Sequence, residues 1–197
     1  MQTTASSGFP RLSGWLLCAV ATTFPHFGCS RAEPGSQPAG TPSALPAPAS
    51  GPLRAGVRAP EVTFNVHSGA PVTLASLRGK PVVVYFYPKD DTPGCTVEAQ
   101  EIRDLYEQIK KADAVVIGVS SDGQDSHRAF AEKHELPFLL ASDESGELAN
   151  AFGVGLKNGR ASRVSFVIGR DGTIKRTFPE VTPRGHAAEL LTAIGSS

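Results

Sequence analysis

The chain has 197 residues, a length that fits one folded domain with accessory segments. Lys plus Arg and Asp plus Glu both number 19, so the formal net charge is zero, which argues against a protein that binds nucleic acid by neutralising phosphates. The three cysteines, Cys18, Cys29 and Cys95, form no C-x-x-C pair, so neither a dithiol oxidoreductase nor a zinc ribbon is supported.

Residues 1–29 have the features of a targeting segment. The mostly apolar run LSGWLLCAVATTFPHFGC is too short for a membrane span, which needs roughly 20 apolar residues, but it has the size of a signal-peptide core. It ends in Gly28-Cys29-Ser30 and so resembles a bacterial lipoprotein signal, although His26 and Phe27 match that pattern poorly. We expect export to the periplasm, with lipidation of Cys29 anchoring the protein to a membrane. The alternatives are cleavage without lipidation, or a start assigned too far upstream and a cytoplasmic protein.

Residues 30–56 follow as a segment that contains six prolines and no aromatic residue. Such a composition buries too little apolar surface to offset the loss of chain entropy on folding. We interpret it as a disordered tether, extended by its prolines, between the anchor and a folded domain that covers residues 57–197.

Strand and helix patterns alternate through this domain. A predicted hairpin comes first, with strands in 61–66 and 71–74, and the apolar β-branched run 81–87 then predicts a strand buried on both faces. Ile102, Leu105, Tyr106 and Ile109 recur at helical spacing. The elements expected after them are strands at 114–120 and 137–142 and helices at 126–135 and 146–152. A hairpin of 163–168 and 173–178 is expected across Asp171-Gly172. The last predicted helix has Thr182 as its N-cap and Pro183 as its first residue. This order predicts an α/β sandwich around a mixed sheet.

Cys95 stands out because it lies at a predicted helix start in the stretch YPKDDTPGCTVEAQE. Thr92 is a suitable N-cap and Pro93 a suitable first residue, which places Cys95 in the first helical turn. Unpaired backbone N–H groups there favour an anion, and a thiolate is a better nucleophile than a thiol. The alternative is a buried structural cysteine, but the polar loop KDDTPG is an unusual setting for one.

These motifs together resemble the Q-type peroxiredoxins, also called bacterioferritin comigratory proteins. YFYPKDDTPGCTVEA is similar to the active-site segment of that family and supplies its Pro-x-x-x-Thr-x-x-Cys pattern as Pro88, Thr92 and Cys95. RVSFVIGRDGTIKRTF is similar to a later hairpin, which carries an active-site arginine, here Arg163. The resemblance covers residue 57 to the C-terminus and implies a thioredoxin-like sandwich with an N-terminal hairpin.

The resemblance also implies the activity of a thiol-dependent peroxidase that needs no cofactor and no metal. Cys95 would attack hydrogen peroxide or an organic hydroperoxide and become a sulfenic acid. Thr92 would hydrogen-bond the sulfur and the peroxide, Arg163 would stabilise negative charge, and Pro88 would shield the site from water. The alternative for Thr92 is a simple helix cap, for Arg163 a surface charge, and for Pro88 the end of a strand. A monomer is expected.

Gln100 marks a departure from many members of this family, which carry a resolving cysteine five residues after the reactive one. Without that thiol, we expect an external thiol, either a thioredoxin-like protein or a small molecule, to reduce the sulfenic acid. Cys29 could form a disulfide with Cys95 only if its sulfur carries no lipid. Two other functions fit a lone thiol: a redox sensor oxidised once, and, less well, a thioredoxin-like thiol–disulfide oxidoreductase.

Overall fold

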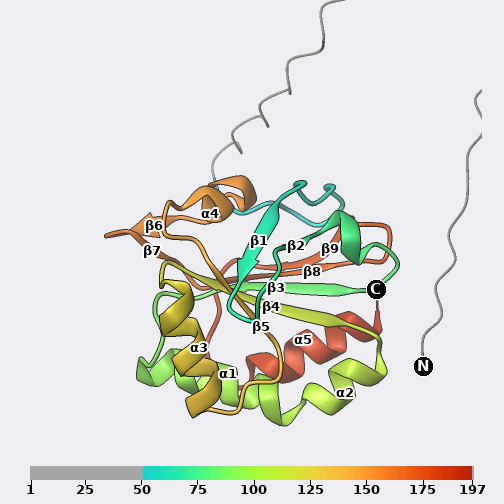
Figure 1. The fold of residues 1–197 in the computed structure, drawn as a ribbon. Coiled ribbons are helices and arrows are strands. Elements are labelled where there is room, and N and C mark those ends of the chain that lie inside the picture. Colours follow the sequence, from blue (N-terminus) through green and yellow to red (C-terminus); the bar gives the residue numbers. More distant parts are fainter. Residues whose placement is uncertain (1–50, 197) are drawn as a thin grey trace, which may run out of the picture. The chain divides into compact units, whose positions relative to one another are not determined.

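The computed structural model describes residues 51–196 (Figure 1). The predicted targeting segment, with Cys29, and residues 30–50 of the predicted tether lie outside the described residues. Residues 51–56, which belong to the predicted tether, contact the folded domain. The Leu53 amide donates to the Phe152 carbonyl at 3.0 Å, and the Gly56 amide to the Ile174 carbonyl at 2.8 Å. The folded part therefore begins several residues before the predicted boundary at Val57.

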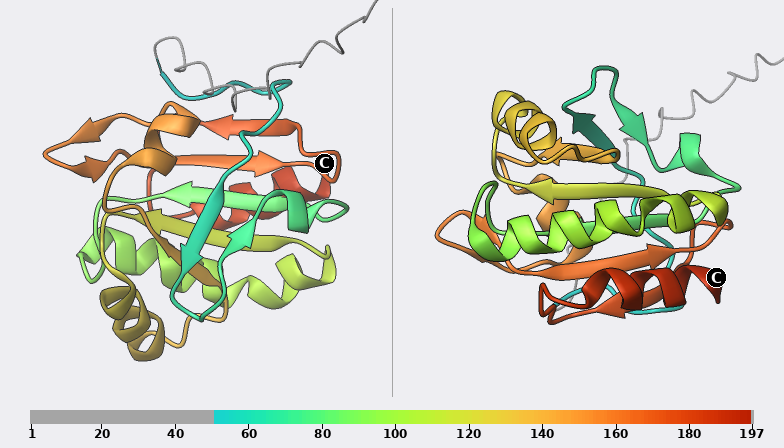
Figure 2. Two further views of the ribbon diagram at one scale, coloured as in Figure 1. Left: turned by 45° about the horizontal axis from the view of Figure 1, so that its top comes forward. Right: turned by 90° about the horizontal axis from the view of Figure 1, so that it is seen from below.

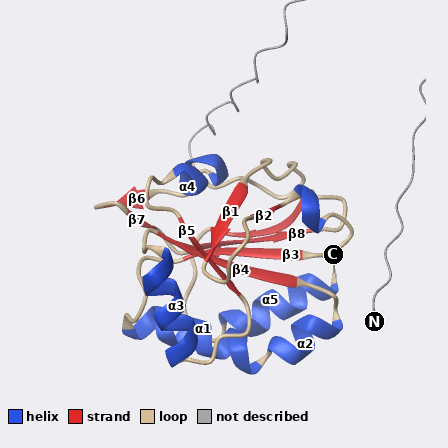
Figure 3. Cartoon of the chain, in the orientation of Figure 1, coloured by secondary structure: helices blue, strands red, loops and turns tan. Residues whose placement is uncertain are grey.

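A mixed seven-stranded sheet forms the centre of the domain (Figure 3). Its three central strands are parallel to one another, and the remaining strands pair antiparallel at the two sides. The spatial order is β2 (Val72–Thr73), β1 (Thr63–Val66), β5 (Leu139–Ser142), β4 (Val115–Ser120), β3 (Val82–Phe86), β8 (Val164–Ile168) and β9 (Ile174–Phe178).

Helices cover both faces of this sheet, as expected for an α/β sandwich (Figures 1 and 2). Four helices lie on one face: α1 (Pro93–Asp104), α2 (Tyr106–Lys111), α3 (Gln124–Lys133) and α5 (His186–Gly195). The short helix α4 (Glu147–Phe152) packs on the other, and a 3₁₀ turn (Ala75–Leu77) follows β2. The predicted fold class is confirmed.

Strand β3 shows how the sequence builds two apolar cores. All five of its residues are buried, and their side chains alternate between the two faces of the sheet. Val84 and Phe86 belong to the cluster that includes α4, whereas Val83 and Tyr85 belong to the cluster beneath α1, α2, α3 and α5. Cys95 is a member of the second cluster.

The predicted start of the last helix is wrong. Helix α5 begins at His186 rather than Pro183, and Thr182 is not its cap. Gly185 precedes the helix with a φ of +86°, a left-handed conformation that ends the turn before it and that glycine adopts without strain. The Gly185 amide is satisfied by the Glu101 carboxylate of α1 at 2.7 Å instead of by a hydroxyl cap.

Two further differences concern local geometry. The predicted helix through Ile102 and Ile109 is interrupted at Leu105, whose φ and ψ of −96° and 2° separate α1 from α2. A short hairpin, β6 (Leu156–Lys157) with β7 (Arg160–Ala161), forms between the predicted helix at 146–152 and the predicted strand at 163–168, where no element is predicted. Its turn is Asn158-Gly159, with positive φ at both residues, a pair that is typical of two-residue hairpin loops.

Candidate active site

Cys95 lies in the first turn of α1, as predicted. Thr92 is the N-cap, with extended backbone angles of −81° and 146°, and Pro93 is the first helical residue. Cys95 is therefore third in the helix, where the backbone N–H groups of the first turn have no partners within the helix. The loop before it follows the carboxyl end of β3, the edge at which open α/β sheets bind their ligands.

Two polar side chains reach the sulfur of Cys95. The Thr92 hydroxyl lies 2.8 Å from Sγ, and Nη2 of Arg163 lies 3.1 Å from it. Arg163 is distant in sequence, but it directly precedes β8, whose first residue pairs with the last residue of β3. The sheet register thus brings Arg163 beside the segment that leads to Cys95.

The Thr92 side chain does not act as a helix cap, because its hydroxyl makes no capping hydrogen bond. The hydroxyl lies instead between Sγ of Cys95 and the Lys89 carbonyl, which is 3.1 Å away. A hydroxyl has one hydrogen and so donates to one of these acceptors at a time. A negatively charged sulfur is the stronger competitor for it.

Glu98 belongs to the same site, although it is not among the residues predicted from the sequence. It is 1% exposed, and its Oε2 accepts a hydrogen bond from Nη1 of Arg163 at 2.7 Å. Burial raises the pKa of Glu98 to about 7, against the opposing effect of the Arg163 charge. The spacing could have revealed it, since a residue three positions after Cys95 lies on the same helix face.

Arg163 thus donates hydrogen bonds to both Cys95 and Glu98, and the backbone of α1 at Gly94 lies close to its guanidinium. A Cβ built on Gly94 would lie 2.9 Å from Nη2 of Arg163 and 3.4 Å from Cγ of Pro183. The absence of a side chain at position 94 leaves room for the guanidinium to reach the sulfur. Cys95 itself is only 2% exposed.

A buried polar network fixes the loop between β3 and α1. Asp90 accepts hydrogen bonds from the hydroxyls of Tyr87 and Ser126, both at 2.7 Å, and its Oδ2 lies 3.0 Å from Nδ1 of the buried His127. Burial alone would raise the pKa of Asp90, but these partners together hold it below its usual value. Pro88 lies within this loop and is half-buried, and its predicted shielding role stays a prediction.

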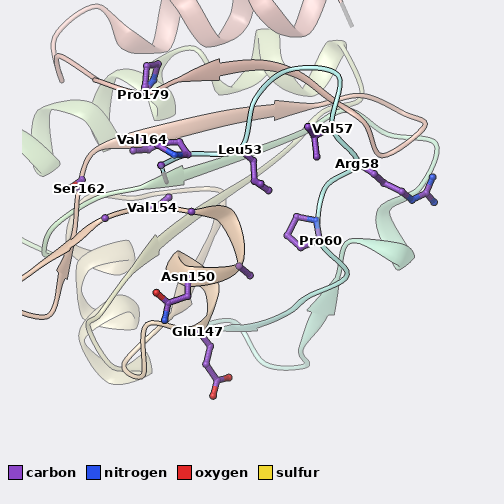
Figure 4. A pocket seen from close by; sticks show the side chains of 15 residues that line it. Leu53, Val57, Arg58, Pro60, Glu147, Asn150, Val154, Ser162, Val164 and Pro179 are labelled. Atoms are coloured by element: carbon purple, nitrogen blue, oxygen red, sulfur yellow. The ribbon is translucent and has the colours of Figure 1, made fainter. Parts of the chain in front are cut away.

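A large cavity of about 1000 Å³ lies elsewhere (Figure 4). Small and apolar side chains form much of its lining, including Leu53, Val154 and Val164, and Arg58 and Glu147 add charge. Cys95, Thr92, Arg163 and Pro88 do not line it. Within residues 51–196, no cluster of three or more His, Cys, Asp or Glu side chains could hold a metal ion.

The fold and the site together define a peroxiredoxin, a thiol-dependent peroxidase on a thioredoxin-like sandwich. The chain belongs to the AhpC/TSA family, which matches residues 55–177. Peroxiredoxin Bcp of Bacillus subtilis (strain 168) is 40% identical over 149 residues, which cover 72% of this chain and 95% of that protein. A chloroplastic peroxiredoxin Q of Sedum lineare is 42% identical over 140 residues, covering 70% and 75% of the two chains.

Solved structures agree with this assignment. A Xanthomonas campestris peroxiredoxin Q structure matches with a TM-score of 0.67 and 32% identity, over 72% of this chain and 97% of its own. Peroxidoxin BcpB of Mycobacterium tuberculosis matches with a TM-score of 0.68 and 31% identity, over 73% and 97%. The resemblance inferred from the sequence motifs, and the thioredoxin-like fold that it implied, are confirmed.

Proposed function

We propose that Cys95 is the nucleophile of this peroxidase and that Thr92 and Arg163 activate it. The observation that supports these roles is the pair of donors, a hydroxyl and a guanidinium, on one sulfur at the start of a helix. Both donors stabilise negative charge on the sulfur. They also lie close enough to stabilise the charge that develops on a peroxide bound there.

The proposed first half-reaction consumes one hydroperoxide. The Cys95 thiolate forms a bond to the terminal oxygen, the O–O bond breaks, and the departing oxygen takes a proton to leave as water or an alcohol. Cys95 is left as a sulfenic acid. A Xanthomonas campestris bacterioferritin comigratory protein, 32% identical to this chain, is described as having alkyl peroxide reduction activity. We extend that substrate class, together with hydrogen peroxide, to this chain.

The second half-reaction is proposed to use an external thiol. Cys95 is the one cysteine among residues 51–196, and it is free. Gln100 occupies the position of the resolving cysteine in many relatives, five residues or about 1.4 turns further along the same helix. An incoming thiol would condense with the sulfenic acid to a mixed disulfide and release water, and a second thiol would then free Cys95.

Treatment with peroxide in the absence of a thiol tests this cycle. We expect the intact mass to rise by one oxygen on Cys95, without an intramolecular disulfide, because no second thiol lies within the folded domain. Excess peroxide should then carry Cys95 to the sulfinic acid. Mass spectrometry of the untreated, treated and thiol-trapped protein measures each species.

A Cys29–Cys95 disulfide in the native protein would contradict the one-cysteine cycle, and it would also show that Cys29 carries no lipid. Gln100→Cys provides a positive control. Residues five apart on a helix lie about 7.5 Å apart along its axis and face different directions, so a disulfide with Cys95 forms only if the helix unwinds locally.

We also propose that the protein is exported and anchored through Cys29. The sequence of residues 1–29 supports this proposal, together with the proline-rich segment that follows it. Among the described residues, no helix has the length and apolar character needed to span a bilayer.

Labelling cells with a fatty-acid analogue checks the anchor. We expect label on the wild-type protein and a periplasmic, membrane-bound fraction, and we expect both to disappear in Cys29→Ser. Unlabelled full-length protein recovered from the cytoplasm would contradict both export and lipidation.

A further inference from the structure

Gln100 takes part in a bridge that joins α1, α3 and the loop before Cys95. Its Nε2 lies 3.3 Å from Nδ1 of His134, the C-cap residue that follows α3. The other ring nitrogen of His134, Nε2, lies 2.9 Å from Oδ1 of Asp91. Asp91 directly precedes the N-cap Thr92 and has a positive φ of 54°. One imidazole thus connects the residue before the helix cap to the second turn of the helix.

The donors and acceptors of the three groups can be matched when the His134 ring is neutral. The Asp91 carboxylate only accepts, so Nε2 of His134 carries the hydrogen and donates it. Hydrogen bonds from Lys133 and His134 hold the pKa of Asp91 below its usual value, in keeping with an ionised carboxylate. In a neutral ring Nδ1 then accepts, and the Gln100 amide supplies the donor. A cysteine at position 100 would have no comparable N–H group to offer.

The same turns of α1 are tied to two other segments. Glu98 binds Arg163 before β8 at 2.7 Å, and Glu101 accepts the Gly185 amide before α5 at 2.7 Å. Arg103 adds a hydrogen bond of 2.9 Å to the His134 carbonyl. Unwinding of α1 around Cys95 would therefore break its contacts with three segments, which precede β8, precede α5 and follow α3. The hydrogen bond from Gln100 to His134 is a contact that a cysteine at position 100 would lack.

We propose that the Gln100–His134–Asp91 bridge is a latch that keeps α1 wound around oxidised Cys95, so that the sulfenic acid is reduced by a small thiol that enters the closed site rather than by a protein dithiol. This inference rests on the proposed one-cysteine cycle. With Cys95 only 2% exposed, a thiol carried on a protein surface reaches its sulfur only if the helix opens, whereas a small molecule needs less room. Gln100 and His134 are positioning residues here and contact no reacting atom.

The reduction balances with two small thiols. The first thiol's sulfur displaces the hydroxyl group of the sulfenic acid, which leaves as water with the thiol proton and gives a mixed disulfide with Cys95. The second thiol attacks the sulfur of the small molecule, releasing a small disulfide and the Cys95 thiol. Two electrons from the two thiols restore the enzyme.

Gln100→Leu tests the latch, because it keeps a side chain of similar size and removes the donor to His134. Lys133→Ala is the matched control, since Lys133 also donates to Oδ1 of Asp91 at 2.9 Å but does not link it to Gln100. The full chain is oxidised with one equivalent of peroxide, and hydrogen exchange is measured across residues 93–103. Turnover is measured with 2-mercaptoethanol and, separately, with thioredoxin and its reductase.

We expect wild type and Lys133→Ala to use 2-mercaptoethanol much better than thioredoxin. In Gln100→Leu, exchange and the thioredoxin rate should each rise about fivefold, as loss of one side-chain hydrogen bond predicts. Formation of sulfinic acid should slow by a similar factor, because an opened site no longer holds a second peroxide, while the first oxidation keeps its rate.

Efficient reduction of wild type by thioredoxin, or unchanged exchange in Gln100→Leu, would overturn the latch. Absence of turnover with both thiols would refute the proposed cycle itself and, with it, the latch.

Discussion

Replacing Cys95 with serine should abolish peroxide turnover. The hydroxyl of serine is nearly isosteric with the thiol, so the domain should keep its fold, but it is not ionised at neutral pH and forms no sulfenic acid. The expected loss is complete, down to the background rate of the thiol with peroxide. Consumption of hydrogen peroxide and of an organic hydroperoxide in the presence of 2-mercaptoethanol measures the effect.

The matched control is Cys29→Ser, which should leave turnover unchanged because Cys29 lies far before the folded domain in sequence and is proposed only as an anchor. Thermal unfolding of both variants shows whether the fold survives. Normal turnover by Cys95→Ser would remove Cys95 from the mechanism. It would also leave a non-catalytic role for the site.

Replacing Arg163 with methionine should lower the peroxidase rate by about 100- to 1000-fold. This range corresponds to the roughly 2.7–4 kcal/mol that an oriented donor to transition-state charge contributes. Methionine retains part of the apolar stem and removes both hydrogen bonds, one to Cys95 and one to Glu98. Stopped-flow measurement of the first oxidation isolates this step from thiol reduction, and alkylation of Cys95 by iodoacetamide should also slow because the donor that lies 3.1 Å from the sulfur is gone.

Arg163→Lys separates charge from geometry. A single ammonium retains the positive charge but lacks the planar fork that reaches sulfur and carboxylate together. We expect a rate between those of wild type and Arg163→Met. Unchanged rates of oxidation and alkylation in Arg163→Met, with a normal unfolding temperature, would show that Arg163 is only structural.

Much of the fold was predictable because its information is local. Short local sequence patterns predict the buried strand β3 and the turn at Asp171-Gly172, and the structure confirms both elements. The start of α5 was not predictable in this way. Thr182-Pro183 is a good local start sequence, but Gly185 takes a left-handed conformation and binds Glu101, a residue of another helix.

The residues of the site also differ in whether local sequence or tertiary packing determines their positions. The placement of Cys95 and Thr92 followed from the helix-start sequence, and Arg163 from the resemblance of its hairpin to that of a known family. Only the antiparallel register of β8 with β3 explains why Arg163 meets the sulfur. Glu98 shares a helix face with Cys95, but its burial against Arg163 depends on tertiary packing. The partnership of Gln100 with His134 likewise joins two helices and leaves no pattern in the sequence.

Gly94 shows how this arrangement limits the choice of residue at one position. Glycine within a helix is less favourable than alanine by roughly 0.5–1 kcal/mol, so alanine at position 94 would improve the helix considered alone. Its methyl group would occupy the space next to Nη2 of Arg163 and push the guanidinium away from the sulfur. Selection for a more stable helix and selection for a reactive sulfur therefore act in opposite directions at this residue, as often happens where function depends on close approach. The domain accepts a weaker first turn, and the space left by a missing methyl group lets Arg163 approach the sulfur of Cys95.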